Sequence, residues 1–191
     1  MTSPLSKAPL FKDRVSKEPM LQVKDLRVYY HTARGPVKAV DGVSFSLEPN
    51  MRLGLVGESG SGKSTLALAL MRMIKPPGQI EGGQVLLGGQ DLVKLSQDAM
   101  RGVRLDQIAM IPQGAMNSLN PVMRIRQQIV DGLRAHDPAL SKQEVDTRVA
   151  EVLDWVDLER SVANMYPHEL SGGMKQRVCI AIAISLRPKV M

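Results

Sequence analysis

The chain has 191 residues, of which 43% are hydrophobic and 23% charged, so it has the composition of a globular protein with a core of its own. Its formal net charge is +6, but lysines and arginines are spread along the chain, so charge alone favours neither nucleic acid nor an acidic membrane surface as a partner. Residues 178–184 form the longest wholly apolar run, which is too short to cross a bilayer, and residues 1–20 lack the apolar stretch of a signal peptide. These features predict a soluble cytoplasmic protein.

The first part of the chain alternates between apolar and polar residues, which is typical of strands. Residues 1–19 lack this periodicity and carry three prolines, so a mobile tail is expected there, with Met20 as an alternative start. A strand is expected over residues 20–30 and its hairpin partner over residues 37–47, joined by a turn over residues 31–36. These segments predict an antiparallel β subdomain.

Shorter elements surround a glycine-rich loop in the next part of the chain. Residues 52–56 predict a short buried strand that leads into the loop, and residues 64–74 carry apolar side chains at a helical spacing after it. Residues 82–92 predict a second β segment with a glycine pair at its turn, and residues 108–111 predict another short apolar strand.

The period becomes helical in the last third of the chain, over residues 122–156. Within it, Ser141 and Glu144 have the spacing of a capping box, which marks the start of a helix. A final helix is expected over residues 172–186, ended by Pro188. Strands that flank a mostly helical insert predict an α/β domain.

Cys179 is the only cysteine, so it has no partner for an internal disulfide, and no histidine lies near it in the sequence for a metal site. Its neighbours Val178, Ile180 and Ile182 are apolar. Because free cysteine is among the most buried residue types, we expect Cys179 to be a small core residue.

The glycine-rich loop has the pattern G-x-x-x-x-G-K-S/T, followed by a threonine. Its residues are Gly57, Glu58, Ser59, Gly60, Ser61, Gly62, Lys63, Ser64 and Thr65. Glycines let the backbone turn several amide N–H groups inward as an anion-binding nest, and the following helix adds its positive N-terminal end. In such a loop Lys63 reaches the β- and γ-phosphates and the Ser64 hydroxyl binds Mg²⁺. A connector without a ligand is the alternative, but the position between a strand and a helix favours nucleotide binding.

A second glycine motif begins the last expected helix. It includes Ser171, Gly172, Gly173 and Gln176, and reads Leu-Ser-Gly-Gly-Met-Lys-Gln-Arg in full. On its own this motif is explained by Ser171 capping a helix. Behind a phosphate loop, however, it resembles the LSGGQ signature of ABC ATPases, in the form common among peptide importers. The resemblance implies that ATP is held between two subunits, by Lys63 of one and Ser171 of the other.

Three further segments carry the same resemblance. Gln113 is similar to the Q-loop glutamine, which implies a catalytic role beside Mg²⁺ and the attacking water; a solvated loop glutamine is the alternative. The stretch from Ser118 to Pro121 resembles oligopeptide, dipeptide and nickel importer ATPases, as does the Tyr-Pro-His-Glu segment that contains His168. The place of His168 just before the signature favours a structural role over a catalytic one.

An aromatic residue near the end of the first strand matches the A-loop position that stacks on adenine in this family. Tyr30 is the preferred candidate because it lies at the end of the strand, and Tyr29, which alternates to the other face, is the competing one.

The resemblance covers residues 20–191 and implies a P-loop NTPase (ABC ATPase) core with an antiparallel β subdomain and a helical subdomain. We expect the β subdomain and phosphate loop in residues 20–112, the Q-loop and helical subdomain in residues 113–170, and the signature helix in residues 171–191. The chain stops before the Walker B strand with its Asp-Glu pair and before the switch histidine. We therefore expect a truncated domain with exposed apolar surface, poor stability on its own and little or no ATP hydrolysis.

The function implied by the resemblance is that of an ATP-binding, energy-coupling subunit of an importer for oligopeptides, dipeptides or a related solute. Its expected partners are transmembrane permease subunits, a second ABC ATPase subunit and, indirectly, a solute-binding protein, at the cytoplasmic face of the membrane. One alternative is a non-transport ABC ATPase that acts on nucleic acid or ribosomes. The lack of a long heptad run and the 3% aromatic content disfavour it, so no nucleic acid is expected. The other alternative is an inactive nucleotide-binding remnant.

Overall fold

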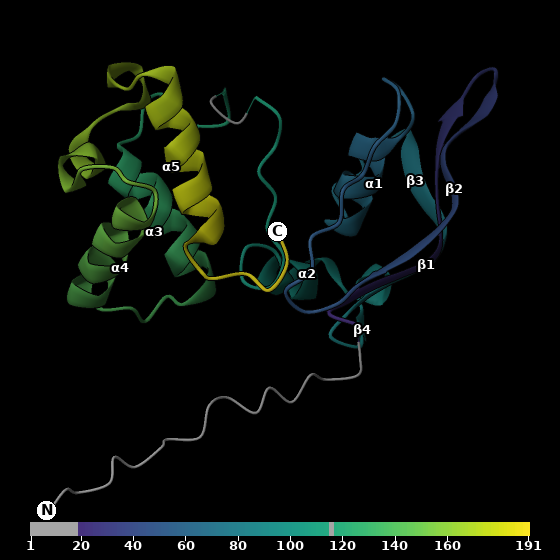
Figure 1. The fold of residues 1–191 in the computed structure, drawn as a ribbon, viewed down its shortest axis with the longest axis horizontal. Helices are drawn as coiled ribbons and strands as arrows, with labels where there is room; N and C mark the ends of the chain where they lie inside the picture. The colour runs from purple at the N-terminus through teal and green to yellow at the C-terminus, as the bar shows by residue number, and fades with distance from the viewer. Residues whose placement is uncertain (1–18, 115–116) are drawn as a thin grey trace, which may run out of the picture.

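The computed structural model describes residues 19–114 and 117–191. The tail expected over residues 1–19 therefore lies outside the described residues, apart from Pro19. The described residues form two parts, shown in Figure 1. One part is a β-sheet with helix α1, and the other gathers helices α3, α4 and α5; the short helix α2 lies below, between them.

Among the described residues the sheet has four strands, in the antiparallel order β2-β1-β3-β4. Their bounds are β1 Leu21–Thr32, β2 Gly35–Leu47, β3 Gly78–Leu87 and β4 Gln90–Asp91. The expected hairpin of the first two strands is confirmed, but its turn is only residues 33–34, because both strands continue into the segment expected to be the turn. The expected second β segment is also confirmed, with an earlier start, and a glycine pair with positive φ forms its turn.

One face of the sheet is apolar and packs on α1 (Lys63–Leu70). The residues of β1 that are buried on this face are Leu21, Val23, Leu26 and Val28. The step from Val23 to Leu26 breaks strict alternation, and a bulge around Asp25, whose φ is +45°, restores it. Each fully buried side chain of this size stabilises the fold by about 1.5–3 kcal/mol relative to exposure.

Helix α1 ends at Leu70, earlier than the residue 74 expected from its apolar spacing. The chain leaves the helix at Arg72, which has a left-handed φ of +49°, and the amide of Met73 donates back to the carbonyl of Leu68. The Arg72 guanidinium also donates to the carbonyl oxygens of Leu92 and Leu95, at 3.2 and 2.5 Å. These tertiary hydrogen bonds fix the end of the helix.

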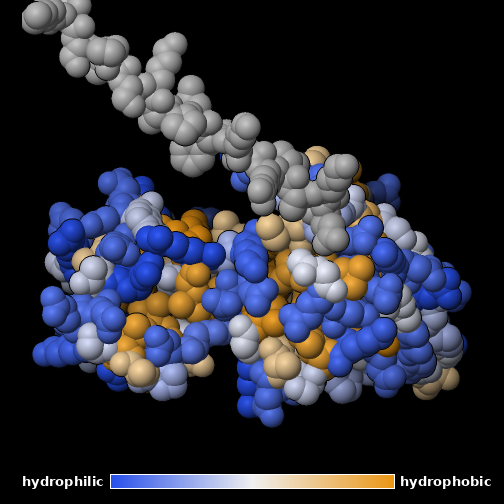
Figure 2. All heavy atoms as spheres, turned by 90° about the horizontal axis from the view of Figure 1, so that it is seen from below, coloured by the Kyte–Doolittle hydropathy of each residue, from blue (hydrophilic) through white to orange (hydrophobic). Residues whose placement is uncertain are grey.

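Two of the expected strands are wrong. Residues 52–56 are extended but form no strand, and their apolar side chains are exposed, to 54% for Leu53 and 91% for Val56. Residues 108–111 form no strand: Ile108 makes only isolated bridges, to Arg104 and to Val190. A strand requires a neighbour for its backbone hydrogen bonds, and none of the described strands runs beside residues 52–56. This exposure agrees with the expectation of uncovered apolar surface, and Figure 2 shows apolar patches among the polar side chains on both parts of the molecule.

The second part of the molecule has its own apolar core between α3 (Ile125–His136), α4 (Lys142–Trp155) and α5 (Gly172–Ile184). The expected capping box at the start of α4 is confirmed, since Ser141 and Glu144 each accept a backbone hydrogen bond from the other. The final helix is confirmed with an end two residues earlier than expected. The described chain also has short helical segments: η1 Leu92–Lys94, α2 Gln97–Val103, η3 Arg160–Asn164 and η4 Pro167–Glu169. Helix α2 was not predicted from the sequence. None of the described helices combines the length and the apolar character that a membrane span requires.

Candidate nucleotide-binding site

The glycine-rich loop lies between the extended residues 51–56 and the start of α1, and it presses against strand β2. Gly60 and Gly62 have φ angles of +81° and +88°, which favour glycine. A Cβ atom on Gly62 would lie 2.1 Å from the carbonyl oxygen of Ala39, so no larger residue fits there without movement of the backbone. The loop therefore needs glycine both for its backbone turn and for its contact with the sheet.

The side chain of Lys63 folds back over the loop. Its Nζ donates to the carbonyl oxygens of Gly57 and Glu58, at 2.8 and 2.6 Å, and to the Ser61 hydroxyl at 3.2 Å. The ammonium group is thus held at the centre of the loop, at the positive end of α1, where phosphate oxygens are the acceptors that such a group prefers. Ser64 is exposed in the first turn of α1, and Thr65 beside it is partly buried.

A cleft of about 300 Å³ lies beside this contact and is lined by both the loop and strand β2. Val40, Asp41 and Val43 line it from the strand, and Ser61 and Lys63 are among the loop residues on its other side. Asp41 was not a sequence candidate, because only the tertiary packing of loop on strand brings it here. The contact between the Ala39 carbonyl and Gly62 was missed for the same reason.

Tyr29 and Tyr30 lie on opposite faces of β1. The Tyr29 hydroxyl donates to Asp41 Oδ1 at 2.5 Å, and the Lys38 ammonium lies 5.3 Å from the centre of the Tyr29 ring. The hydrogen bond with Asp41 raises the pKa of Tyr29 and lowers that of Asp41. Tyr30 alternates to the face of Val28, where α1 packs, and its ring is partly buried.

The signature residues are at the start of α5, in the helical part. The Ser171 hydroxyl caps this helix by accepting from the amide of Met174 at 3.3 Å. Gly172, Gly173 and Gln176 are exposed. Because α1 and α5 lie in different parts of the molecule, the structure does not bring Ser171 to Lys63 within one chain (Figure 1).

Gln113 lies in an exposed turn with Gly114, on the segment that connects the two parts. None of the hydrogen bonds found among the described residues joins its side chain to the phosphate loop. Its expected place beside Mg²⁺ therefore stays a prediction.

His168 packs on its neighbours in a way that supports the structural interpretation. Its ring stacks on the Tyr166 ring, with centroids 5.6 Å apart and an angle of 13° between the planes. The Arg124 guanidinium lies 5.0 Å from the Tyr166 ring centre and donates to the Asn164 carbonyl at 2.6 Å. These contacts stabilise the segment that precedes α5, and the signature residues are at the start of α5.

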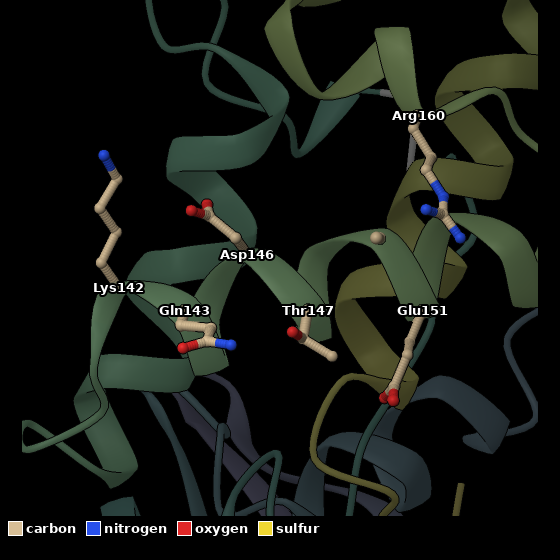
Figure 3. A pocket seen from close by; sticks show the side chains of 7 residues that line it. Lys142, Gln143, Asp146, Thr147, Glu151 and Arg160 are labelled. Atoms are coloured by element: carbon tan, nitrogen blue, oxygen red, sulfur yellow. The ribbon is translucent and has the colours of Figure 1, made fainter.

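A second hollow, of about 610 Å³, lies along α4 in the helical part and is shown in Figure 3. Lys142 and Arg160 stand at its two ends and do not converge on a common point. Asp146 is already paired with Arg126 at 2.6 Å, and Arg160 with Asp154 at 2.7 Å. Across the described residues no group of histidine, cysteine and acidic side chains is arranged to hold a metal ion. This hollow has the features of a solvated surface rather than a ligand site.

Comparison with known proteins agrees with these observations. Residues 40–191 match the family described as ABC transporter. The chain belongs to this family. The α/β P-loop architecture expected from the sequence, with its antiparallel and helical subdomains, is confirmed by this match and by the solved ABC cassettes that the chain resembles.

Two curated relatives and one solved structure illustrate the likeness. The chain is 44% identical to the oligopeptide transport ATP-binding protein OppD of Bacillus subtilis (strain 168), over 90% of this chain and 49% of the relative. It is 41% identical to the dipeptide transport ATP-binding protein DppD of Caldanaerobacter subterraneus subsp. tengcongensis, over 90% of this chain and 53% of the relative. The ATP-binding cassette MJ0796, a dimer in a post-hydrolysis state bound to ADP and Pi, superimposes with a TM-score of 0.76 at 28% identity, over 88% of this chain and 71% of that one. The chain thus spans about half the length of the curated relatives that it matches.

Proposed function

We propose that this chain is the nucleotide-binding part of an ATP-binding, energy-coupling subunit of an ABC importer for oligopeptides, dipeptides or a related solute. The observation that carries the proposal is the position of Lys63, whose Nζ is held over the loop by two carbonyl oxygens and a hydroxyl. The names of the relatives, which are peptide and dipeptide transport ATP-binding proteins, support the choice of solute.

In this proposal the phosphates of ATP lie in the loop from Gly57 to Thr65. Lys63 exchanges its contacts with the loop for phosphate oxygens, and the amides at the start of α1 donate to the same group. The close contact of Gly62 with the Ala39 carbonyl supports this fit, because it holds the loop against strand β2 in its glycine-dependent conformation. Ser64 and Gln113 are the proposed ligands of Mg²⁺, and Tyr30 is the proposed contact of the adenine ring.

The second half of the proposed ATP site comes from another subunit. Ser171, Gly172, Gly173 and Gln176 are at the start of a helix that lies apart from the phosphate loop, and all four are exposed. An exposed helix start with two glycines is suited to contact a phosphate group presented by a partner. The dimeric state of the MJ0796 cassette supports a site shared by two subunits, for which we propose a head-to-tail arrangement.

The proposed setting is the cytoplasmic face of the membrane, where the subunit associates with transmembrane permease subunits and, through them, with a solute-binding protein. The segment from Asn117 to Pro121 in the helical part is the proposed contact with the permease. Uptake of a labelled tripeptide by cells with and without the gene tests this setting: equal uptake in the two strains would rule out an essential role in peptide import.

Nucleotide binding is tested by thermal unfolding of the chain with and without Mg·ATP. A ligand that binds only the folded state at a hundred times its Kd stabilises it by about 2.7 kcal/mol, so the melting temperature rises. We expect this rise to disappear in Lys63→Ala and to remain in Lys24→Ala, an exposed lysine on the sheet. A rise of equal size in Lys63→Ala would overturn the proposed site.

A further inference from the structure

Tyr30 on strand β1 and Gly78 on strand β3 are direct neighbours on adjacent strands of the sheet. They are paired in the antiparallel register of β1 and β3, and Gly78 opens the second of these strands. A Cβ atom on Gly78 would lie 2.6 Å from Cε1 and 3.0 Å from Cδ1 of the Tyr30 ring. One edge of the ring thus occupies the space that any other residue at position 78 would need.

The backbone does not explain why residue 78 is a glycine. Its φ lies outside the left-handed range that favours glycine, and its amide donates to the Lys75 carbonyl at 2.9 Å as any residue's amide would do. Ile74 is also close to the position of this added Cβ, which would lie 2.8 Å from Ile74 Cγ2. Glycine at this position is therefore explained by the room that the aromatic ring requires, in the way that aromatic side chains cover glycines on neighbouring strands.

We infer that Gly78 is a positioning residue for nucleotide binding: it seats the Tyr30 ring so that its remaining surface is presented to the base. The inference rests on the proposed role of Tyr30 as the adenine contact. A ring that is already held in one place loses little conformational freedom when a base stacks on it, so seating the ring favours affinity.

The position of the ring relative to the phosphate loop supports this role. Tyr30 pairs with Val37 on strand β2, two residues before Ala39, whose carbonyl oxygen touches the loop at Gly62. Since two residues along a strand span about 7 Å, the ring and the phosphate loop are separated by a distance that a nucleoside bridges.

The inference is tested by comparing the affinity for Mg·ATP with the affinity for Mg·tripolyphosphate, each measured by isothermal titration calorimetry on the 191-residue chain. The ratio of the two isolates what the nucleoside contributes, and stacking of a base on an aromatic side chain is worth about fivefold or more in affinity. We expect the ratio to fall in Gly78→Ala about as far as in Tyr30→Ala, while the affinity for tripolyphosphate is unchanged. Gly82→Ala is the matched control, because a Cβ on this glycine of the same strand would meet no atom within 4 Å.

The possible outcomes distinguish a failure of the positioning role of Gly78 from a failure of the proposed role of Tyr30 as the adenine contact. If Tyr30→Ala lowers the ratio and Gly78→Ala does not, the positioning role of Gly78 is wrong and the role of Tyr30 stands. If neither variant lowers the ratio, both are wrong. If Gly78→Ala fails to bind tripolyphosphate, its fold is disturbed, and Ile74→Ala decides: removing the side chain beside the ring is expected to lower the ratio, and an unchanged ratio overturns the inference.

Discussion

The hydroxyl of Tyr29 donates a 2.5 Å hydrogen bond to the carboxylate of Asp41, and so ties strand β1 to strand β2 beside the phosphate loop. Asp41 also lines the cleft next to that loop. Tyr29 is therefore engaged within the sheet, whereas Tyr30 presents its ring on the side where α1 packs. The two tyrosines are adjacent in sequence, but Tyr29 is held by a hydrogen bond within the sheet and Tyr30 is the proposed contact of the adenine ring.

This difference predicts unequal effects of substitution at the two tyrosines. Tyr29→Phe removes one exposed hydrogen bond and is expected to change the affinity for Mg·ATP by less than about twofold. Tyr30→Ala is expected to weaken it at least about fivefold, by loss of stacking on the base. Calorimetric titration of both variants measures this; a larger loss in Tyr29→Phe would make Tyr29 the adenine contact.

Gly62→Ala is expected to disrupt both the conformation of the loop and its binding of Mg·ATP. The added Cβ would lie 2.1 Å from the Ala39 carbonyl oxygen, at a residue whose φ is +88°. Strain of this kind costs about 1–3 kcal/mol, which urea unfolding would detect, and the stabilisation by Mg·ATP should be lost.

The matched control for this variant is Gly102→Ala, within helix α2. Apart from the backbone of its own helix and its chain neighbours, none of the described residues has an atom within 4 Å of the Cβ position of Gly102, so alanine there is expected to stabilise the protein by about 0.5–1 kcal/mol. Equal stability of Gly62→Ala and the parent chain would show that the loop can move away from β2.

The capping box of α4 predicts a pH-dependent stability. The Ser141 hydroxyl and amide both donate to the Glu144 carboxylate, at 2.7 and 2.8 Å, and these hydrogen bonds lower the pKa of Glu144. A carboxyl group with a lower pKa in the folded state stabilises the protein above its unfolded pKa, and this contribution is lost as the pH falls through the folded value. Glu144→Gln should therefore melt at a lower temperature than the parent at neutral pH, with a difference that shrinks as the pH falls below the ordinary glutamate pKa of about 4.3 and through the lower folded value.

Melting curves across this pH range test the effect. Asp106→Asn, which removes an exposed carboxylate outside the capping box, is the control. A difference between Glu144→Gln and the parent that is constant with pH would show that the carboxylate charge has no part in capping.

Elements held by local contacts were predictable from the sequence, and elements held by distant ones were not. The capping box joins residues three apart, and the β1–β2 hairpin joins neighbouring strands, so alternation and cap spacing were sufficient to predict them. The end of α1 depends on Arg72 donating to carbonyls about twenty residues away, and no local pattern carries that information. Residues 52–56 have the composition of a buried strand, yet composition does not supply the neighbouring strand that backbone pairing requires.

The candidate site divides in the same way. The spacing of glycines and Lys63 was sufficient to predict a turned loop before α1 with Lys63 beside it, because these features are local, and phosphate binding by the loop stays a prediction. The contribution of β2 to the cleft, through Ala39 and Asp41, depends on how the loop packs on the sheet. Gly78 had no signal of its own, since only the register of β1 against β3 shows that it lies beneath Tyr30.

Cys179 is expected to report on the integrity of the helical core. Its side chain is buried between the helices, and this burial raises the pKa of the thiol. Because the thiolate is the reactive form, alkylation by iodoacetamide at mildly alkaline pH should be much slower in the native protein than in guanidinium chloride. Mass spectrometry of the labelled chain measures both rates, and similar rates would mean that the helical part opens readily.

The uncovered residues before the phosphate loop are expected to make the chain associate with itself. Leu53 and Leu55 are 54% and 50% exposed, and they line an apolar groove of about 530 Å³ with Phe45, Ile108 and Met191. Contiguous apolar surface of this kind drives association. Leu53→Ser should reduce self-association in sedimentation velocity and lower the fluorescence of bound ANS, at a stability cost of about 1 kcal/mol or less, because half of the side chain is already exposed.

Val122→Ser is the matched control, since Val122 is 80% exposed but belongs to the helical part and does not line the groove. If the two variants reduce association equally, the groove is not its cause; if only Leu53→Ser does so, the surface before the phosphate loop is responsible.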